Sequence, residues 1–150
     1  MVKKYDYTVE PAVSVLLNID SASDDCGDEI ERCFSLTRTV CETLEEKRIP
    51  YRFVTNAGAA GAITLWSQVS DGLGAGHLST VLEGLGRATY EPLRPFTHTL
   101  QQTIRHVEQG RTHILITPQR EMPWQYELSR LEQLSGARAL ILTPEEVMLP

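Results

Sequence analysis

Apolar residues follow two different spacings along this chain, and the change of spacing separates the predicted elements. Residues 12–19 form a short, almost wholly apolar run rich in valine and leucine, which is typical of a strand covered on both faces of a sheet. From Ile30 onward the spacing becomes three and four residues, which predicts one long helix that ends before Pro50. Its inward face is expected to hold Ile30, Cys33, Phe34, Thr37, Val40, Cys41 and Leu44.

The rest of the chain continues to alternate between strand-like and helix-like patterns. We expect further strands over residues 51–56, 62–70, 112–118 and 137–146, further helices over 77–89, 96–110 and 123–136, and a break over 90–95. The small residues at 57–61 suit a hairpin, so one strand should run antiparallel. The order predicts an α/β fold: a three-layer, doubly wound, mostly parallel sheet with one antiparallel strand, as in Rossmann-like proteins.

Composition and charge exclude several classes of protein. The 150 residues fit one domain, expected over 12–150, after a polar lead-in arm over 1–11. A net charge of -6, with no basic cluster longer than Lys3–Lys4, argues against nucleic-acid binding. No apolar run is long enough to cross a bilayer and no signal peptide is visible, so we expect no membrane contact by this segment.

The cysteine pattern indicates a reducing compartment. The three cysteines show no C-x-x-C spacing, and two of them fall on the inward helix face. Burial as reduced thiols is therefore favoured over disulfides or a metal site, and a cytoplasmic location follows. The four histidines show no zinc-ligand spacing. Trp66 and Trp124 are candidates for exposed contact residues, although Trp66 on a strand is more typical of a core.

Clustered oxygen ligands follow the first strand. In a doubly wound sheet, ligands gather at the carboxyl ends of the strands, and three loops qualify: residues 20–25, 56–61 and 117–121. Only the first carries several acidic and hydroxyl side chains, beginning with Asp20. Such a loop can hold a divalent cation, or it can cap the helix that contains Ile30.

The stretch from Val13 to Ser23, VSVLLNIDSAS, resembles the first strand and metal-site motif of von Willebrand factor A-like domains. There the strand ends in Asp-x-Ser-x-Ser, whose side chains hold a divalent cation. The likeness is closer to the C-terminal half of family 58 of the bacterial domains of unknown function, whose Gly-x-x-His-Leu helix start is similar to residues 74–78 here. The resemblance covers residues 2–146. It implies that the chain is the C-terminal part of a longer protein.

The resemblance carries over to the site only in part. Asp20 matches the motif's aspartate, Ala22 stands at the first serine, and Asp24 stands at the second serine. Asp20 and Asp24 are therefore the candidate metal ligands of a degenerate metal-ion-dependent adhesion site. Two side-chain ligands without a third predict weak binding of magnesium or manganese, and capping is the favoured interpretation.

Later positions of the motif also lack the expected ligand residues. An alternative register that starts at Asn18 places the aspartate and the following alanine in the serine places. The acidic residue expected after a later parallel strand is replaced by Thr117 and Pro118, and the distal threonine ligand has only Ser79 and Thr80 in its neighbourhood.

Two functions from different classes remain open. The resemblance implies a non-enzymatic protein-interaction module that binds a protein partner, namely a MoxR-type AAA+ ATPase. The alternative is a small nucleotide- or phosphate-binding enzyme that uses the Gly72–Gly76 turn, since a helix N-terminus can bind phosphate. That turn lacks the Gly-Lys-Ser/Thr end of a P-loop. A receiver-like phosphoacceptor role for Asp20 ranks last.

Overall fold

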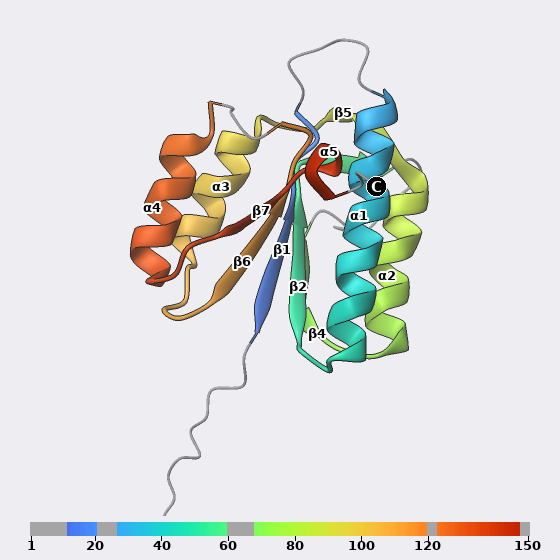
Figure 1. Cartoon of the computed structure of the whole chain (residues 1–150), viewed down its shortest axis with the longest axis horizontal. Helices are drawn as coiled ribbons and strands as arrows, with labels where there is room; N and C mark the ends of the chain where they lie inside the picture. Colours follow the sequence, from blue (N-terminus) through green and yellow to red (C-terminus); the bar gives the residue numbers. More distant parts are fainter. Residues whose placement is uncertain (1–11, 21–26, 60–67, 120–122, 148–150) are drawn as a thin grey trace, which may run out of the picture.

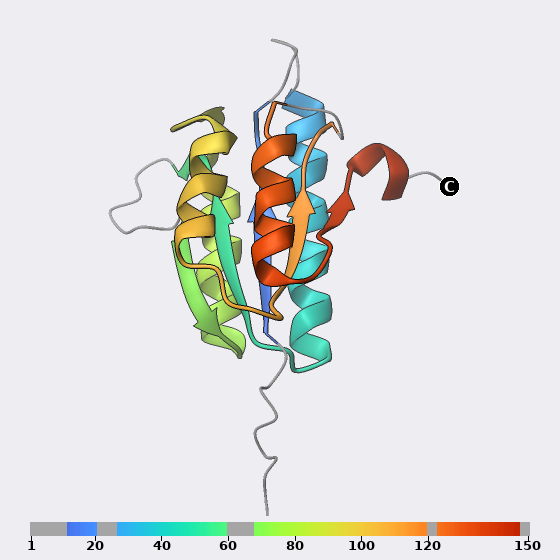
Figure 2. The same ribbon diagram turned by 90° about the vertical axis from the view of Figure 1, so that its left-hand side faces the viewer.

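The chain folds into three layers, with two helices on each face of a central sheet (Figures 1 and 2). The computed structural model describes residues 12–20, 27–59, 68–119 and 123–147. The sheet contains β1 (Val13–Leu17), β2 (Tyr51–Thr55), β4 (Gln68–Gly72), β6 (Thr112–Ile116) and β7 (Leu140–Leu142). Helices α1 (Gly27–Glu46) and α2 (Ala75–Arg87) cover one face, and α3 (Phe96–Arg105) and α4 (Gln125–Ser135) cover the other. A short helix α5 (Pro144–Val147) follows β7.

The strand order is β4-β2-β1-β6-β7. β1 pairs in parallel with both β2 and β6, so it is the central strand, and β7 pairs in parallel with β6. β4 lies at the edge and pairs antiparallel with β2. The predicted α/β class, with a mostly parallel sheet and one antiparallel strand, is therefore confirmed.

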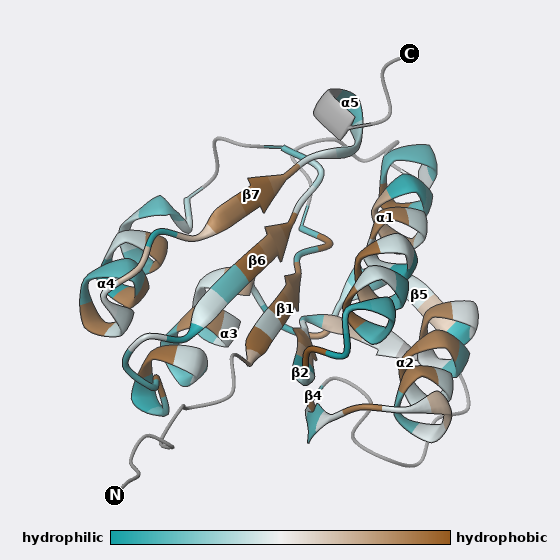
Figure 3. Ribbon diagram, turned by 60° about the horizontal axis from the view of Figure 1, so that its bottom comes forward, coloured by the Kyte–Doolittle hydropathy of each residue, from teal (hydrophilic) through white to brown (hydrophobic). Residues whose placement is uncertain are grey.

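Alternation along β1 divides the core into two clusters. Val15 and Leu17 pack toward α1 and α2, whereas Leu16 packs toward α3 and α4 with Leu115 of β6. Every residue of β1 is buried, as expected for a strand that is covered on both faces. Figure 3 shows the apolar character of β1, of β7 and of the carboxyl half of β6, in contrast to the mixed surfaces of the helices.

Helix α1 confirms the predicted inward face. Of the seven residues expected there, six are buried, and Val40 is partly buried against the same cluster. Helix α1 ends at Glu46, four residues before Pro50, which cannot continue a helix. Helix α4 ends at Ser135, and Gly136 follows as its C-cap with a φ of 80°, the left-handed conformation that glycine adopts without strain.

Two short strands were not predicted. Ala57–Ala59 forms β3 and Ala88–Pro92 forms β5, and the two pair antiparallel in a separate ribbon. The sequence had suggested a hairpin connection at the first segment and a helix end followed by a break at the second. The partners lie about thirty residues apart in sequence, so local patterns do not reveal the pairing. The final strand is also shorter than predicted, because α5 begins at Pro144.

Some predicted segments lie outside the described residues. These are the lead-in arm over 1–11, the part of the expected strand over 62–67, and the loop residues 21–26. The remaining part of the expected strand, from Gln68 onward, belongs to β4.

Candidate functional site

Asp20 lies at the carboxyl end of β1 and caps a helix. Its Oδ2 accepts a hydrogen bond from the backbone N–H of Phe96 at 2.8 Å, and its Oδ1 accepts one from Nδ2 of Asn56 at 3.1 Å. Phe96 is the first residue of α3, whose N-cap position is Pro95 and makes no side-chain capping bond. A carboxylate at a helix N-terminus is stabilised by the unpaired N–H groups and by the helix dipole. Asp20 therefore caps α3, whereas the rest of the loop that was expected to cap α1 lies outside the described residues.

Neutral side chains at the ends of three parallel strands form a buried network around this carboxylate. Asn18, Asn56 and Thr117 follow β1, β2 and β6, and all three are fully buried. Oδ1 of Asn56 accepts from the backbone N–H of Ile19 at 3.0 Å, and its Nδ2 also donates to the carbonyl of Arg94 at 3.2 Å. Nδ2 of Asn18 donates to Oγ1 of Thr117 at 3.0 Å. This network was not predicted from the sequence, although each member is a polar residue directly after an apolar strand.

The described neighbours of Asp20 do not fit a cation. Both carboxylate oxygens face N–H donors, which favour an anion at that position and would repel a metal ion. The hydroxyl of Thr117 donates to the carbonyl of Gln119 and accepts from an amide, so it is already engaged. Asp24, the second predicted ligand, lies outside the described residues. Within the described ranges, no group of three or more acidic, histidine or cysteine side chains is arranged to hold a metal.

The β3–β5 ribbon lies beside this network, and two large apolar side chains are exposed there: Tyr90 on β5 and Leu93 directly after it. The backbone N–H of Leu93 donates to the carbonyl of Asn56 at 2.7 Å, which ties the ribbon to the carboxyl end of β2. Leu93 packs over Gly58 so closely that a Cβ at the glycine would lie 3.0 Å from the leucine side chain. Tyr90 packs over Gly27 at the start of α1, and its hydroxyl donates to the carboxylate of Glu31.

The Gly72–Gly76 turn lies at the other end of the sheet. Gly72 pairs with Tyr51, the first residue of β2, whereas Asp20 follows the last residue of β1. The backbone N–H of Gly74 donates to both carboxylate oxygens of Glu45, at 2.9 and 3.2 Å. The helix N-terminus that would bind phosphate is thus capped by a carboxylate of the chain itself, and the turn and Asp20 do not share a site.

Close packing against His77 explains why position 72 is a glycine. A Cβ at that position would lie 2.6 Å from Nδ1 of His77. The imidazole of His77 stacks edge-on against Tyr51 and shares a hydrogen bond with the Tyr51 carbonyl at 2.8 Å. Ser79 and Thr80 also belong to the exposed side of the first turns of α2, so the structure does not bring them to Asp20.

A cluster of charged side chains lies at the amino end of the sheet. Arg111 is buried, and it bonds both carboxylate oxygens of Asp71, with one distance of 3.0 Å. It also donates to Oγ of Ser14 at 2.6 Å and to the carboxylate of Glu108 at 3.2 Å. Arg52 donates to the same two carboxylates. Two cations and two anions therefore balance one another in one network.

This charge cluster changes the ionisation of its members. Partial burial alone would raise the pKa of Asp71, but hydrogen bonds from Arg111 and Arg52 outweigh it and lower the pKa below its usual range. His113 lies beside Ser14 in the register of β1 and β6. Its burial, followed by repulsion from Arg111 and Arg52, lowers the pKa of His113 to about 4. This histidine is therefore neutral at pH 7.

The predicted burial of Cys33 and Cys41 on the inward face of α1 is confirmed. Cys33 and Cys41 are free and buried. Burial, and then the nearby Glu29, raises the pKa of Cys33 to about 12, and burial has the same effect at Cys41. These thiols are protonated and unreactive at neutral pH. Cys26 lies outside the described residues.

The prediction that Trp124 is an exposed contact residue was wrong. Its side chain is 1% exposed and meets Phe96 edge to face, with ring centroids 6.3 Å apart. Trp124 therefore belongs to the core between α3 and α4 and offers no contact surface. Trp66 lies outside the described residues.

Among the helices that the structure describes, none combines the length and the apolar composition that crossing a bilayer requires. Comparison with known proteins adds no family to this description: no protein-family model matches the chain, and no curated protein matches it significantly.

Proposed function

We propose that this chain is a non-enzymatic protein-interaction module that binds a protein partner through the carboxyl end of its sheet. The observation that carries the proposal is the pair of large apolar side chains on the β3–β5 ribbon: Tyr90 is 47% exposed and Leu93 is 61% exposed. Leu93 lies next to the Asp20 network, and Tyr90 lies three residues earlier, against the start of α1. Exposed aromatic and apolar side chains that gather on one surface are typical of protein contacts.

Acidic side chains lie beside Tyr90. Asp28 and Glu31 lie on the first turns of α1 beside Tyr90, and Glu91 is exposed on β5 between the two apolar residues. A partner with an apolar pocket and a basic rim would complement this surface in both respects, and the opposite charges would steer the encounter. A MoxR-type AAA+ ATPase is the partner that the family resemblance implies, and this choice of partner rests on that resemblance.

Contacts with the rest of the fold hold Tyr90 and Leu93 in place, which favours this surface as a binding site. Tyr90 is held against α1 by ring contacts with Phe34, at a centroid distance of 6.3 Å, and by its bond to Glu31. Leu93 is fixed by the bond between its backbone and Asn56. Side chains that are already ordered lose little conformational entropy when a partner binds.

A matched pair of double variants tests the proposal. Tyr90→Ser with Leu93→Ser removes the ribbon surface, while Tyr126→Ser with Leu134→Ser removes an exposed tyrosine and leucine from α4. Binding to a purified MoxR-type ATPase from the same genome is measured by biolayer interferometry. We expect at least a tenfold loss of affinity for the ribbon variant and an unchanged affinity for the α4 variant. Equal losses in both variants would contradict the assignment of the surface, and no binding by the wild type would remove this partner.

The magnesium or manganese ion stays a prediction from the sequence and is tested separately. Calorimetric titration with either ion, for the wild type and for Asp20→Ala, distinguishes the two roles of the carboxylate. Heat of binding that disappears in the variant would support an ion at Asp20. A reproducible absence of heat in the wild type, with a lower melting temperature in the variant, would leave Asp20 as a cap alone.

A further inference from the structure

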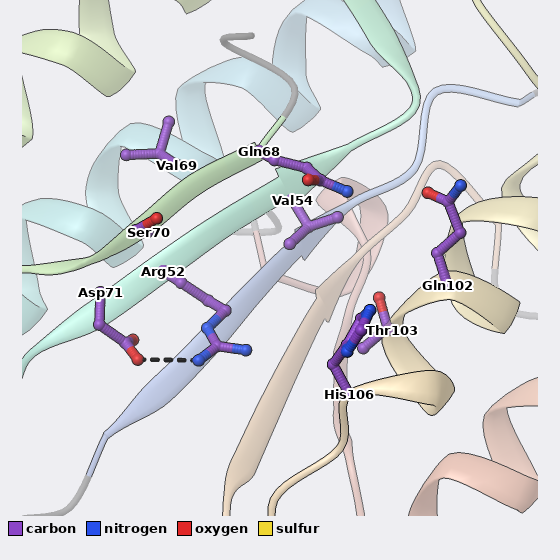
Figure 4. Close-up of a pocket in the computed structure, with 9 residues that line it drawn as sticks. All are labelled: Arg52, Val54, Gln68, Val69, Ser70, Asp71, Gln102, Thr103 and His106. Carbon is purple, nitrogen blue, oxygen red and sulfur yellow. Dashed lines mark hydrogen bonds and ion pairs between the residues drawn. The ribbon is translucent and has the colours of Figure 1, made fainter.

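A groove opens on the α3 side of the sheet, away from the carboxyl-end surface. It has a volume of about 480 Å³, which lies within the range of small-molecule sites. Its floor is formed by β2, one wall by the edge strand β4, and the other wall by α3 (Figure 4). The lining residues are Arg52, Val54, Gln68, Val69, Ser70, Asp71, Gln102, Thr103 and His106.

Arg52 directs unused hydrogen-bond donors into this groove. Its Nη2 donates to Asp71 at 2.9 Å and to Glu108 at 3.1 Å. The N–H groups on Nε and Nη1 have no partner among the described residues. Figure 4 shows the second terminal nitrogen directed away from Asp71, toward the side of the groove that α3 forms. A guanidinium has only donors, in a planar arrangement that matches the two oxygens of a carboxylate.

Other lining side chains add hydrogen-bonding groups to this groove. The side chains of Gln68, Ser70 and His106 have no hydrogen-bond partner within the described parts of the chain, and Gln102 contacts only His98, at 3.4 Å. Each of them can donate at least one N–H or O–H. These side chains can also accept, so Arg52, which only donates, is the group that requires an acceptor from a ligand, and Val54 offers an apolar floor for a short carbon chain.

The ion pairs of Arg52 leave it available to a ligand. Asp71 is held by the buried Arg111, which bonds both of its oxygens, so Asp71 does not depend on Arg52 for neutralisation. The side chain of Glu108 is 59% exposed, and water screens an ion pair of that kind, so the pair contributes little to stability. A ligand carboxylate can therefore replace or join Glu108 at Arg52 with little loss of stability.

We propose that this groove binds a small organic carboxylate, which accepts a hydrogen bond from Nη1 of Arg52. His106 and Gln68 donate to the remaining acceptors of the ligand, and its carbon chain lies over Val54. This site is independent of the protein-binding surface on the β3–β5 ribbon. Inorganic phosphate offers similar acceptors, and the experiment separates it from a carboxylate.

Succinate is a suitable probe, since it carries a carboxylate at each end of a short carbon chain. The full chain, labelled with ¹⁵N, is titrated with succinate, with neutral succinamide and with inorganic phosphate, and amide chemical shifts are recorded. We expect succinate to shift amides of β2, β4 and α3 with a saturable dependence on concentration. Succinamide and phosphate are expected to bind at least fivefold more weakly.

Three variants connect the binding to the named residues. Arg52→Gln removes the guanidinium, while Arg87→Gln removes an exposed arginine from α2 and serves as the matched control. His106→Ala removes an exposed side chain, so it keeps the test valid if Arg52→Gln lowers stability. We expect at least a fivefold loss of succinate affinity in the first, an unchanged affinity in the control, and a smaller loss in the third. Shifts outside the groove, equal binding of succinamide, or full affinity in both groove variants would overturn the proposal.

Discussion

The two ends of the sheet organise their polar side chains in opposite ways. At the carboxyl end, one carboxylate, Asp20, is surrounded by neutral amide and hydroxyl groups and by backbone N–H groups. At the amino end, two arginines and two carboxylates share hydrogen bonds in a cluster beside the buried His113. The first arrangement depends on complete hydrogen bonding among groups that mostly do not titrate. The second depends on charge balance, and it should respond to pH.

The comparison also explains how two helices begin. Helices α2 and α3 start at opposite ends of the sheet, and each is capped by a carboxylate from a distant part of the chain, Glu45 for α2 and Asp20 for α3. The helix N-terminus that suggested a phosphate site and the aspartate that suggested a metal site are thus both hydrogen-bonded to groups of the chain itself. The capped ends secure the helices, and the surfaces left for ligands lie beside them.

The largest effect is expected at the amino end, for Arg111→Met. The variant leaves Asp71 with only Arg52 and removes the bond to Ser14, so part of the charge becomes unpaired near the core. Loss of a partner from a fully buried ion pair costs about 3–5 kcal/mol, and the partial exposure of Asp71 places the expected loss of unfolding free energy near 3 kcal/mol.

Urea unfolding at pH 7 measures that loss, with Arg130→Met as control. Arg130 is exposed on α4, and its replacement should change the free energy of unfolding by less than about 0.5 kcal/mol. A similar small change for Arg111→Met would show that the cluster does not stabilise the amino end.

At the carboxyl end, Asn56→Ala should lower the free energy of unfolding by about 2 kcal/mol. The amide of Asn56 bonds Ile19, Asp20 and Arg94, and a buried group that loses its partner costs about 1–3 kcal/mol. Chemical denaturation of this variant is compared with Gln133→Ala, which removes an exposed amide from α4. Equal stability of the two variants would mean that water replaces the lost bonds at no expense, and the carboxyl end would then not depend on its amides.

A change of pH should affect the amino end through His113. Because its folded pKa of about 4 lies below the unfolded value of 6.5, the unfolded chain binds the extra proton between these values. The contribution is therefore fully present above pH 6.5 and is lost as the pH falls toward 4. Between pH 7 and pH 5 the loss should be about 2 kcal/mol.

The variant His113→Gln isolates this contribution. It should show a flatter dependence of unfolding free energy on pH between 7 and 5, measured by urea titrations at fixed ionic strength. Asp71, whose pKa is lowered, contributes stability that disappears only below its ordinary value near 3.8, so it does not affect this window. An unchanged slope in the variant would assign the pH dependence to other groups.

Sequence patterns predict the layers of this fold because burial imposes a local period. The inward face of α1 and the apolar run of β1 can both be read within one element. The β3–β5 ribbon could not be predicted, since its strands are short and their pairing is distant in sequence. A capping role was predicted for the loop that begins at Asp20, but the cap at α3 could not be predicted, because Phe96 lies 76 residues away.

The buried polar residues of the site were harder to predict from the sequence than the fold. Asn18 and Asn56 carry a weak signal, since each directly follows an apolar strand. Arg111 carries none, because an arginine before a strand is ordinarily a surface residue. The wrong assignment of Trp124 has the same origin: its burial depends on Phe96 of another helix, and one sequence does not specify which helices are neighbours.

The smallest effect is expected for Asp20→Asn, which sharpens the contrast between charge and hydrogen bonding at the carboxyl end. Asparagine keeps the size of the side chain and one acceptor oxygen, but it loses the negative charge at the N-terminus of α3 and the second acceptor. The expected loss of unfolding free energy is about 1 kcal/mol, and amide hydrogen exchange should speed up in the first turn of α3. The comparison variant is Glu45→Gln, which removes the corresponding charge at α2. If Asp20→Asn leaves exchange in α3 unchanged while Asp20→Ala accelerates it, hydrogen bonding alone secures this helix, and the charge of Asp20 is free for another role at the surface.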